Sequence, residues 1–213
     1  MTKQQKTSAL LIGISLIIMA IAAGFAYGHV FNTLSTSNTL KDFQNNMSLF
    51  KIGNLAWILI IVTDLIVSIA VYYFFKPYHK NIAILSAGSR LIYTLILSLA
   101  FSFILRINLS TPYDEIMKNM ETFELVWQWG LIIFGIHLVL LGLGHFSTDH
   151  LPNLLGLLLV IAGLSYMLTS GLHVIMPEKE SLITLINNIL MLPMVVGELG
   201  FGIYLMVKAK KSS

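Results

Sequence analysis

Four ionisable side chains lie inside apolar stretches of the sequence, where such residues are rare. Asp64, Arg90, His137 and Glu198 each interrupt a separate apolar run of membrane-spanning length. A charge in hydrocarbon costs roughly 3 kcal/mol on insertion scales, so these residues usually face a bundle interior, find partners there and mark a functional site. Two carboxylates, one guanidinium and one imidazole together could form ion pairs, exchange protons or bind a polar ligand.

The four positions lie at similar depths in their helices. At about 1.5 Å per helical residue, Asp64 is about 18 Å from Lys76, and the other three are about 13 to 15 Å from the corresponding helix ends. This agreement predicts that the four side chains meet at one level inside the bundle. Tyr93, on the same face as Arg90, and Tyr166, at a similar depth, extend the predicted site.

Arg90 is the natural partner of Asp64, because the two lie on runs joined by a very short connection and a guanidinium suits a carboxylate. Glu198 and His137 would then remain as the couple able to exchange protons, and the sequence leaves their protonation states open. A purely architectural role is the alternative, since a buried polar cluster can simply set the register of the helices.

The composition is that of a membrane protein. Of 213 residues, 56% are hydrophobic and 11% charged, with a mean hydropathy of +0.82, against roughly 25% charged residues in soluble domains. We expect an all-α fold, a single domain of six transmembrane helices. The predicted spans are 8–28, 52–75, 82–107, 123–146, 154–176 and 182–207.

Several smaller patterns complete the predicted bundle. Between the first two spans, Leu40, Phe43, Met47 and Phe50 recur every three or four residues, which predicts a short helix lying on the membrane surface. Glycines predict close helix contacts. The pattern is Gly130, His137 and Gly144 on the fourth span, and Gly156, Gly163 and Ser170 on the fifth.

The distribution of charge predicts the orientation. Lysines gather at one end of the predicted bundle, which places both termini in the cytoplasm. Trp57, Trp127 and Trp129 all fall near the opposite membrane boundary, where indole rings prefer to lie.

Other classes of function find little support in the sequence. The net charge of +3 is small, so nucleic acid is not an expected partner, and the absence of cysteine excludes disulfides and thiolate chemistry. We expect no cofactor and no metal. The histidines and the aspartate of the connections match no metal motif; they are His79, His145, Asp149 and His150.

From about Phe50 onward the chain resembles a family of bacterial membrane proteins known as domain of unknown function 4386. The resemblance is carried by the aspartate of the second span with its run ending FFKP, by RLIY, by FGIHLVLLGLG, by LPNLLGLLLVIAGLSYML and by GELGFGIYLMVK. The connection GHFSTDHLPN departs from it by lacking basic residues. The resemblance implies a multi-pass bundle in the bacterial cytoplasmic membrane, and it brings no established catalytic or binding residue.

The leading hypothesis is a cavity, open toward the cytoplasmic half, that binds a small hydrophobic, amphiphilic or lipid-like ligand for sensing or transport. In it Arg90 would hold Asp64 or an anionic group of the ligand. Besides membrane lipids, the expected partner is a second copy of the chain, because six spans are few for an independent transporter. One alternative is an intramembrane enzyme with Glu198 and His137 as acid and base. The other is an accessory subunit with an architectural cluster.

Overall fold

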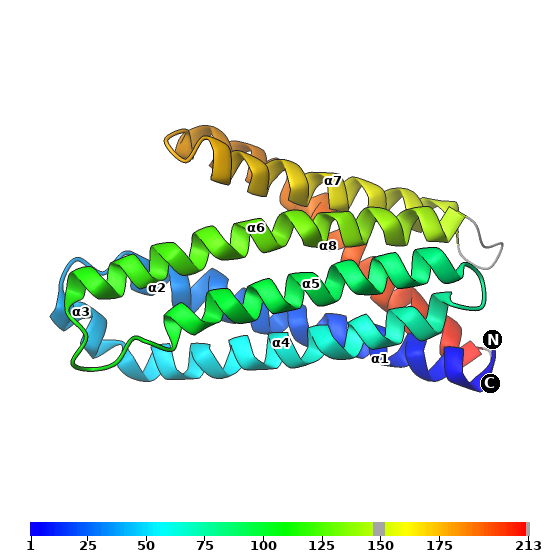
Figure 1. Cartoon of the computed structure of the whole chain (residues 1–213), viewed down its shortest axis with the longest axis horizontal. Coiled ribbons are helices and arrows are strands. Elements are labelled where there is room, and N and C mark those ends of the chain that lie inside the picture. Colours follow the sequence, from blue (N-terminus) through cyan, green and yellow to red (C-terminus); the bar gives the residue numbers. More distant parts are fainter. Residues whose placement is uncertain (147–151, 212–213) are drawn as a thin grey trace.

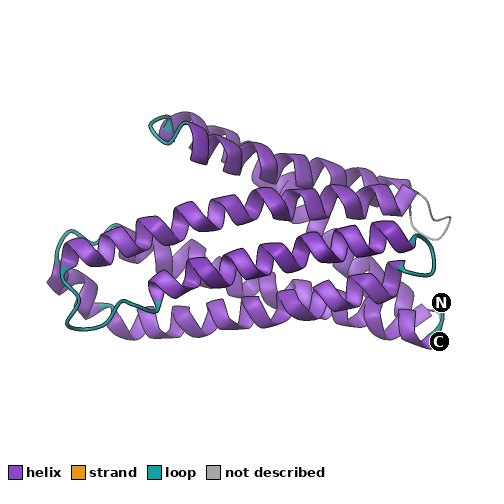
Figure 2. Ribbon diagram, viewed as in Figure 1, coloured by secondary structure: helices purple, strands orange, loops and turns teal. Residues whose placement is uncertain are grey.

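The computed structural model describes residues 1–146 and 152–211, which form helices and, within those ranges, no strand (Figures 1 and 2). The elements are α1 (Lys3–Ala23), the π-helix η1 (Gly24–Phe31), α2 (Asn32–Ser35), α3 (Leu40–Asn45), α4 (Met47–Phe75), α5 (Lys80–Ile104), α6 (Tyr113–Phe146), α7 (Asn153–Ile175) and α8 (Glu180–Lys211). The segments α1, η1 and α2 follow one another without a break, so the first 33-residue helix runs from Lys3 to Ser35.

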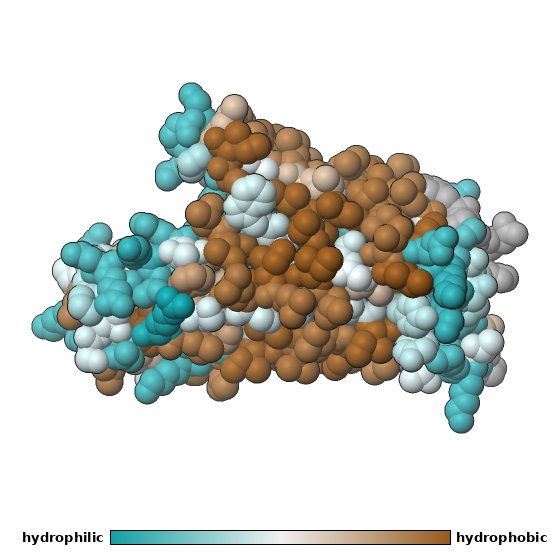
Figure 3. All heavy atoms as spheres, in the orientation of Figure 1, coloured by the Kyte–Doolittle hydropathy of each residue, from teal (hydrophilic) through white to brown (hydrophobic). Residues whose placement is uncertain are grey.

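Six helices in the described part of the chain are long and apolar enough to cross a membrane. They are Lys3–Ser35, Met47–Phe75, Lys80–Ile104, Tyr113–Gly144, Asn153–Ile175 and Glu180–Lys211. The visible surface is apolar across the middle of the molecule and hydrophilic mainly at its two ends (Figure 3). A helix satisfies its own backbone hydrogen bonds, which is what a hydrocarbon environment requires. The predicted all-α bundle of six membrane-spanning helices is therefore confirmed.

The six long helices form a closed ring. Extensive contacts join α1 to α4, α4 to α5, α5 to α6, α6 to α7, α7 to α8, and α8 back to α1. Both ends of the chain lie at the same end of the bundle (Figure 1). A ring of this kind encloses an interior to which every helix can turn one face.

The first and fourth spans extend furthest beyond the predicted boundaries. The first span does not stop at Gly28, because η1 and α2 carry the helix on to Ser35. The fourth begins at Tyr113 rather than at 123. Its first turn holds Asp114 and Glu115, which suit the positive end of a helix dipole. Polarity marked these segments as loops in the sequence, but helices can extend beyond the apolar layer.

The predicted short helix is present as α3, and the apolar residues that predicted it pack against the protein. Phe43, Met47 and Phe50 are all buried, and the ring centroids of Phe43 and Phe50 lie 5.5 Å apart. Tyr113 also donates a hydrogen bond to the carbonyl of Ser37, which ties this segment to the start of α6. The apolar spacing that suggested a membrane-facing surface is satisfied inside the molecule.

The three tryptophans differ in how far their side chains are exposed. Trp129 is 54% exposed and suits a membrane boundary, but Trp57 is buried. Its ring lies 5.2 Å from that of Trp127, nearly perpendicular to it. These two indoles belong to an aromatic cluster inside the bundle.

Glycines on both sides of α6 allow close helix packing. A Cβ added at Gly130 would lie 3.3 Å from the Tyr93 ring on α5, so the predicted glycine pattern does face another helix. A second pattern faces α7. A Cβ at Gly135 would lie 2.6 Å from the carbonyl oxygen of Gly163, and one at Gly142 would lie 2.6 Å from that of Gly156.

Candidate functional site

Asp64 and Arg90 form a buried ion pair between α4 and α5. Arg90 Nη2 lies 2.6 Å from Asp64 Oδ1, and the side chains are 1% and 0% exposed. The antiparallel hairpin sets their register, which a hydrogen bond from the Ser68 hydroxyl to the Ala87 carbonyl, 2.8 Å long, also supports. The pair predicted from the short connection is therefore present.

His137 completes the arrangement around Arg90 from α6. Its Nδ1 lies 2.8 Å from the Ser86 carbonyl oxygen, and its Nε2 lies 3.2 Å from Arg90 Nη1. A carbonyl only accepts and a guanidinium only donates. These contacts therefore assign the proton to Nδ1 and leave Nε2 as an acceptor, so the imidazole is neutral and both ring nitrogens are engaged.

Glu198 reaches the same guanidinium from α8, but more loosely. Its Oε1 lies 3.9 Å from Arg90 Nη2, and its side chain is 17% exposed. The preceding residue, Gly197, packs against α7, where an added Cβ would lie 2.8 Å from the Leu158 carbonyl oxygen. Successive residues of a helix point about 100° apart. The contact at Gly197 therefore turns Glu198 away from α7 toward the interior.

The two tyrosines of the predicted site lie on either side of Phe134. The Tyr93 ring lies 4.9 Å from Phe134, and the Tyr166 ring meets it edge to face at 5.1 Å. The Trp127 indole nitrogen donates to the Tyr93 hydroxyl over 3.4 Å. Arg90 also faces Phe134, with Cζ 5.1 Å from the ring centroid. The structure thus brings all six predicted residues to one region of the interior.

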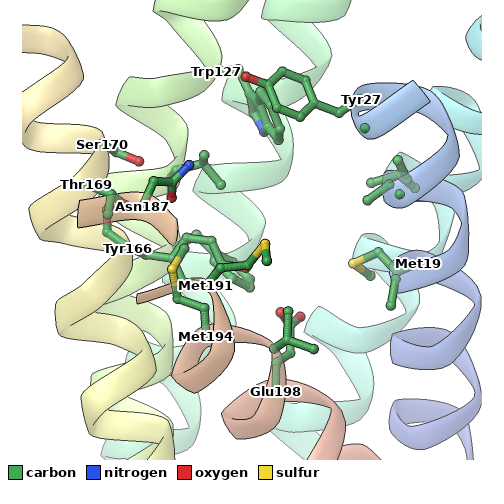
Figure 4. A pocket seen from close by; sticks show the side chains of 18 of the residues that line it. Met19, Tyr27, Trp127, Tyr166, Thr169, Ser170, Asn187, Met191, Met194 and Glu198 are labelled. Carbon is green, nitrogen blue, oxygen red and sulfur yellow. Dashed lines mark hydrogen bonds between the residues drawn. The ribbon is translucent and has the colours of Figure 1, made fainter. Parts of the chain in front are cut away.

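A cavity of about 390 Å³ lies beside this cluster, and Glu198 lies at one end of it (Figure 4). Three of the six predicted residues line it, namely Tyr93, Tyr166 and Glu198. Asp64, Arg90 and His137 do not, and their side chains are almost fully buried. The predicted site therefore divides into a covered ionic cluster and an accessible face that carries one carboxyl.

The cavity occupies the half of the bundle away from the termini. On α1 and α5 its lining begins at Leu16 and Tyr93, and on α8 it extends no further toward the C-terminus than Leu199. Relative to the predicted cytoplasmic termini, the cavity lies in the half of the bundle opposite to the one expected. The physical reason is the packing of α1 against α8 near the termini. A Cβ at Gly13 would lie 2.5 Å from the carbonyl oxygen of Gly202, so the two helices leave no space there.

Farther from the termini, α1 and η1 flank the cavity on one side and α8 on the other (Figure 4). Met191 and Val195 line the cavity and are also 58% and 46% exposed. Across from them, Gly24 and Gly28 line it with no side chain, and a Cβ added at either would meet nothing within 4 Å. The cavity therefore reaches the lipid-facing surface between α1 and α8.

Polar and aromatic groups that sequence reasoning did not select lie at the far end of the cavity. The Tyr27 hydroxyl donates to Glu124 over 2.8 Å, and the same carboxyl oxygen lies 3.7 Å from His173 Nε2. Tyr27 also meets the Trp127 ring at 4.7 Å. In the sequence, Glu124 could have indicated this polar group, because it is a carboxylate just inside the predicted fourth span. Tyr27 and His173 resemble ordinary boundary residues in the sequence.

The structure offers no candidate metal centre among the described residues, where no three potential ligands come together. Asp149 and His150 lie outside the described residues, and so does the side chain of His145. His79 precedes α5 in the connection from α4.

Fold and site together define a multi-pass helical membrane protein with a buried ionic cluster beside a lipid-facing cavity. The chain belongs to the family described as domain of unknown function (DUF4386), whose profile matches residues 11–209. An uncharacterized protein of the archaeon Archaeoglobus fulgidus is 32% identical over 110 residues, which cover 52% of this chain and 60% of the relative. No solved structure matches the chain.

Proposed function

We propose that the protein binds a small amphiphilic or lipid-like ligand in the cavity beside Glu198, for sensing or transport in the cytoplasmic membrane. The observation that carries this proposal is the cavity itself. It lies inside a membrane-spanning bundle, opens between two helices and has a carboxyl at one end. Its volume of about 390 Å³ is within the usual range for small-molecule sites.

The lining suits a molecule with a polar end and an apolar body. Apolar walls are formed by aliphatic, methionine and aromatic side chains from α1, α4, α6 and α8. The polar groups are few and separated, as in most small-molecule sites. Besides Glu198 they include Gln128 on α6, Thr169 on α7 and Asn187 on α8. A ligand dissolved in the bilayer could enter between α1 and α8 without crossing water.

Sensing and transport make different demands on the rest of the bundle. A transporter must open the site to both sides, and α1 and α8 are tightly packed at Gly13 and Gly202. A second copy of the chain would be needed to supply moving surfaces for such a cycle. An acid–base enzyme finds less support, because His137 does not line the cavity and both its ring nitrogens have partners.

The test compares two glycine-to-leucine variants that differ only in where the new side chain goes. Gly24→Leu would project into the cavity, whereas Gly88→Leu lies on α5 outside the lining, and a Cβ at either position meets nothing within 4 Å. Dodecanol serves as a neutral amphiphilic probe, and native mass spectrometry of the purified protein measures its dissociation constant. We expect Gly24→Leu to weaken binding by about tenfold, or about 1.4 kcal/mol, and Gly88→Leu to leave it unchanged. Equal binding by both variants and the wild type would contradict the proposal and favour an architectural cluster.

A further inference from the structure

We propose that the ligand is a cation, a lipophilic amine whose ammonium group lies between Glu198 and the aromatic wall of the cavity. This inference rests on the proposed function and specifies the chemical class of the ligand. It follows from the balance of charge around Arg90, from the side chains that line the cavity, and from the absence of lysine and arginine among the described residues that line it.

The buried cluster contains one more carboxyl than it contains cations. Arg90 lies 2.6 Å from Asp64 and 3.9 Å from Glu198, so its charge is committed mainly to Asp64. His137 contributes no charge, because its Nδ1 proton faces a carbonyl oxygen and its Nε2 accepts from the guanidinium. Glu198 is thus the carboxyl whose countercharge is incomplete, and it is the one that reaches the cavity.

The cavity wall next to Glu198 is also suited to a cation. Tyr166 lies near Glu198 in the cavity, with Met191 and Met194 close by (Figure 4). Aromatic faces attract ammonium groups through the negative charge density of the ring face. One face of the nearby Phe134 already lies against the Arg90 guanidinium. The same type of contact is available to a second cation at Tyr166.

An anionic ligand would find no accessible positive partner. Among the described residues that line the cavity there is no lysine or arginine. Arg90 is 1% exposed, and its terminal nitrogens are covered by Asp64, His137 and Met19. His173 lies at the far end of the cavity and faces Glu124. The expectation that Arg90 would hold an anionic group of the ligand therefore gives way to Glu198 holding a cationic one.

The experiment compares three probes with the same chain, dodecylamine, dodecanol and dodecanoate, by native mass spectrometry of the wild type, Glu198→Gln and Gly24→Leu. The glutamine keeps the size and polarity of the side chain and removes its capacity for charge. We expect the wild type to bind the amine about tenfold more tightly than the alcohol, and dodecanoate least tightly. Glu198→Gln should lose this preference for the amine over the alcohol.

Each outcome has a definite meaning. Equal affinity for amine and alcohol in the wild type, with both weakened in Gly24→Leu, overturns the cationic ligand but leaves the cavity as a binding site. Tightest binding of dodecanoate overturns the inference in the same way. Probe binding that is insensitive to Gly24→Leu contradicts the proposed function itself. The wild-type comparison does not depend on the folding of any variant.

Discussion

At the scale of single residues, Arg90 contacts three ionisable side chains in the interior of the bundle, and these contacts differ in distance and in exposure. Asp64 is close and fully covered, His137 accepts a hydrogen bond, and Glu198 is more distant and partly accessible. Breaking a buried ion pair by removing one member is strongly destabilising, because the other charge is left uncompensated. The two members of the Asp64–Arg90 pair are not equivalent in this respect. Arg90 would retain Glu198 as a countercharge, whereas Asp64 has Arg90 alone among its described contacts.

This asymmetry predicts different losses of stability. Arg90→Met leaves Asp64 buried without a countercharge and should lower the free energy of unfolding by about 3–5 kcal/mol. Asp64→Asn should cost less, about 1–3 kcal/mol, because Glu198 still faces Arg90. Unfolding in mixed micelles with increasing sodium dodecyl sulfate measures both values, and Arg106→Met, at an exposed arginine, is the matched control. A larger loss for Asp64→Asn than for Arg90→Met would show that Glu198 does not stabilise the guanidinium.

At the scale of elements, small residues determine where the helices touch and thereby where the cavity can form. Helices in a membrane associate through close packing, because lipid tails are as apolar as the side chains they meet. Gly135 and Gly163 bring α6 and α7 together, and Gly197 brings α8 against α7. The close contact of α1 with α8 at Gly13 ends before the cavity begins. Open space is therefore left where these glycine contacts stop.

The packing of α6 against α7 leads to a prediction about two glycines. An added Cβ at Gly135 would lie 2.6 Å from a backbone oxygen, which cannot move without separating the helices, whereas one at Gly171 would meet nothing within 4 Å. Gly135→Ala should therefore lower the free energy of unfolding by about 1–3 kcal/mol. Gly171→Ala should change it by less than about 0.5 kcal/mol. Thermal unfolding in detergent compares them, and equal midpoints would mean that α6 and α7 are not in this close contact.

At the scale of the whole molecule, the ring has two different ends. The end that carries the termini is closed by the contact of α1 with α8 and gathers basic side chains from four helix ends. These are Lys3, Lys6, Lys76, Lys80, Lys208, Lys210 and Lys211. The other half contains the cavity, the aromatic cluster and the contact of Tyr27 with Glu124. Positive residues concentrate on the cytoplasmic side of membrane proteins, so we propose that the termini are cytoplasmic and that the cavity lies in the outer half of the bilayer.

The orientation can be tested by cysteine labelling, because the natural sequence contains no cysteine. Ser110 and Asn81 are both exposed, and they lie at opposite ends of α5, Ser110 in the connection to α6 and Asn81 near the start of α5. A membrane-impermeant maleimide added to intact spheroplasts should label Ser110→Cys. It should label Asn81→Cys only after the cells are lysed. The reverse pattern would place the termini outside and the cavity in the cytoplasmic half.

Most of the architecture and the composition of the ionic cluster could be predicted from residue types alone. An apolar run of sufficient length has to cross the membrane as a helix, and an ionisable residue within it has to find a partner. These arguments lead to six helices and to Asp64, Arg90, His137 and Glu198. They fail at helix ends, where polar residues such as Asp114 look like a loop.

Only the tertiary structure decided which of these side chains is accessible. Most faces of a transmembrane helix are apolar, so local periodicity does not show how the helix is rotated or tilted against its neighbours. That choice is made by contacts between distant segments, such as Gly13 with Gly202 and Gly135 with Gly163. The resulting packing covers Arg90, leaves Glu198 partly accessible and places the cavity away from the termini. The sequence alone determined that costly groups must meet, and packing determined which of them a ligand can reach.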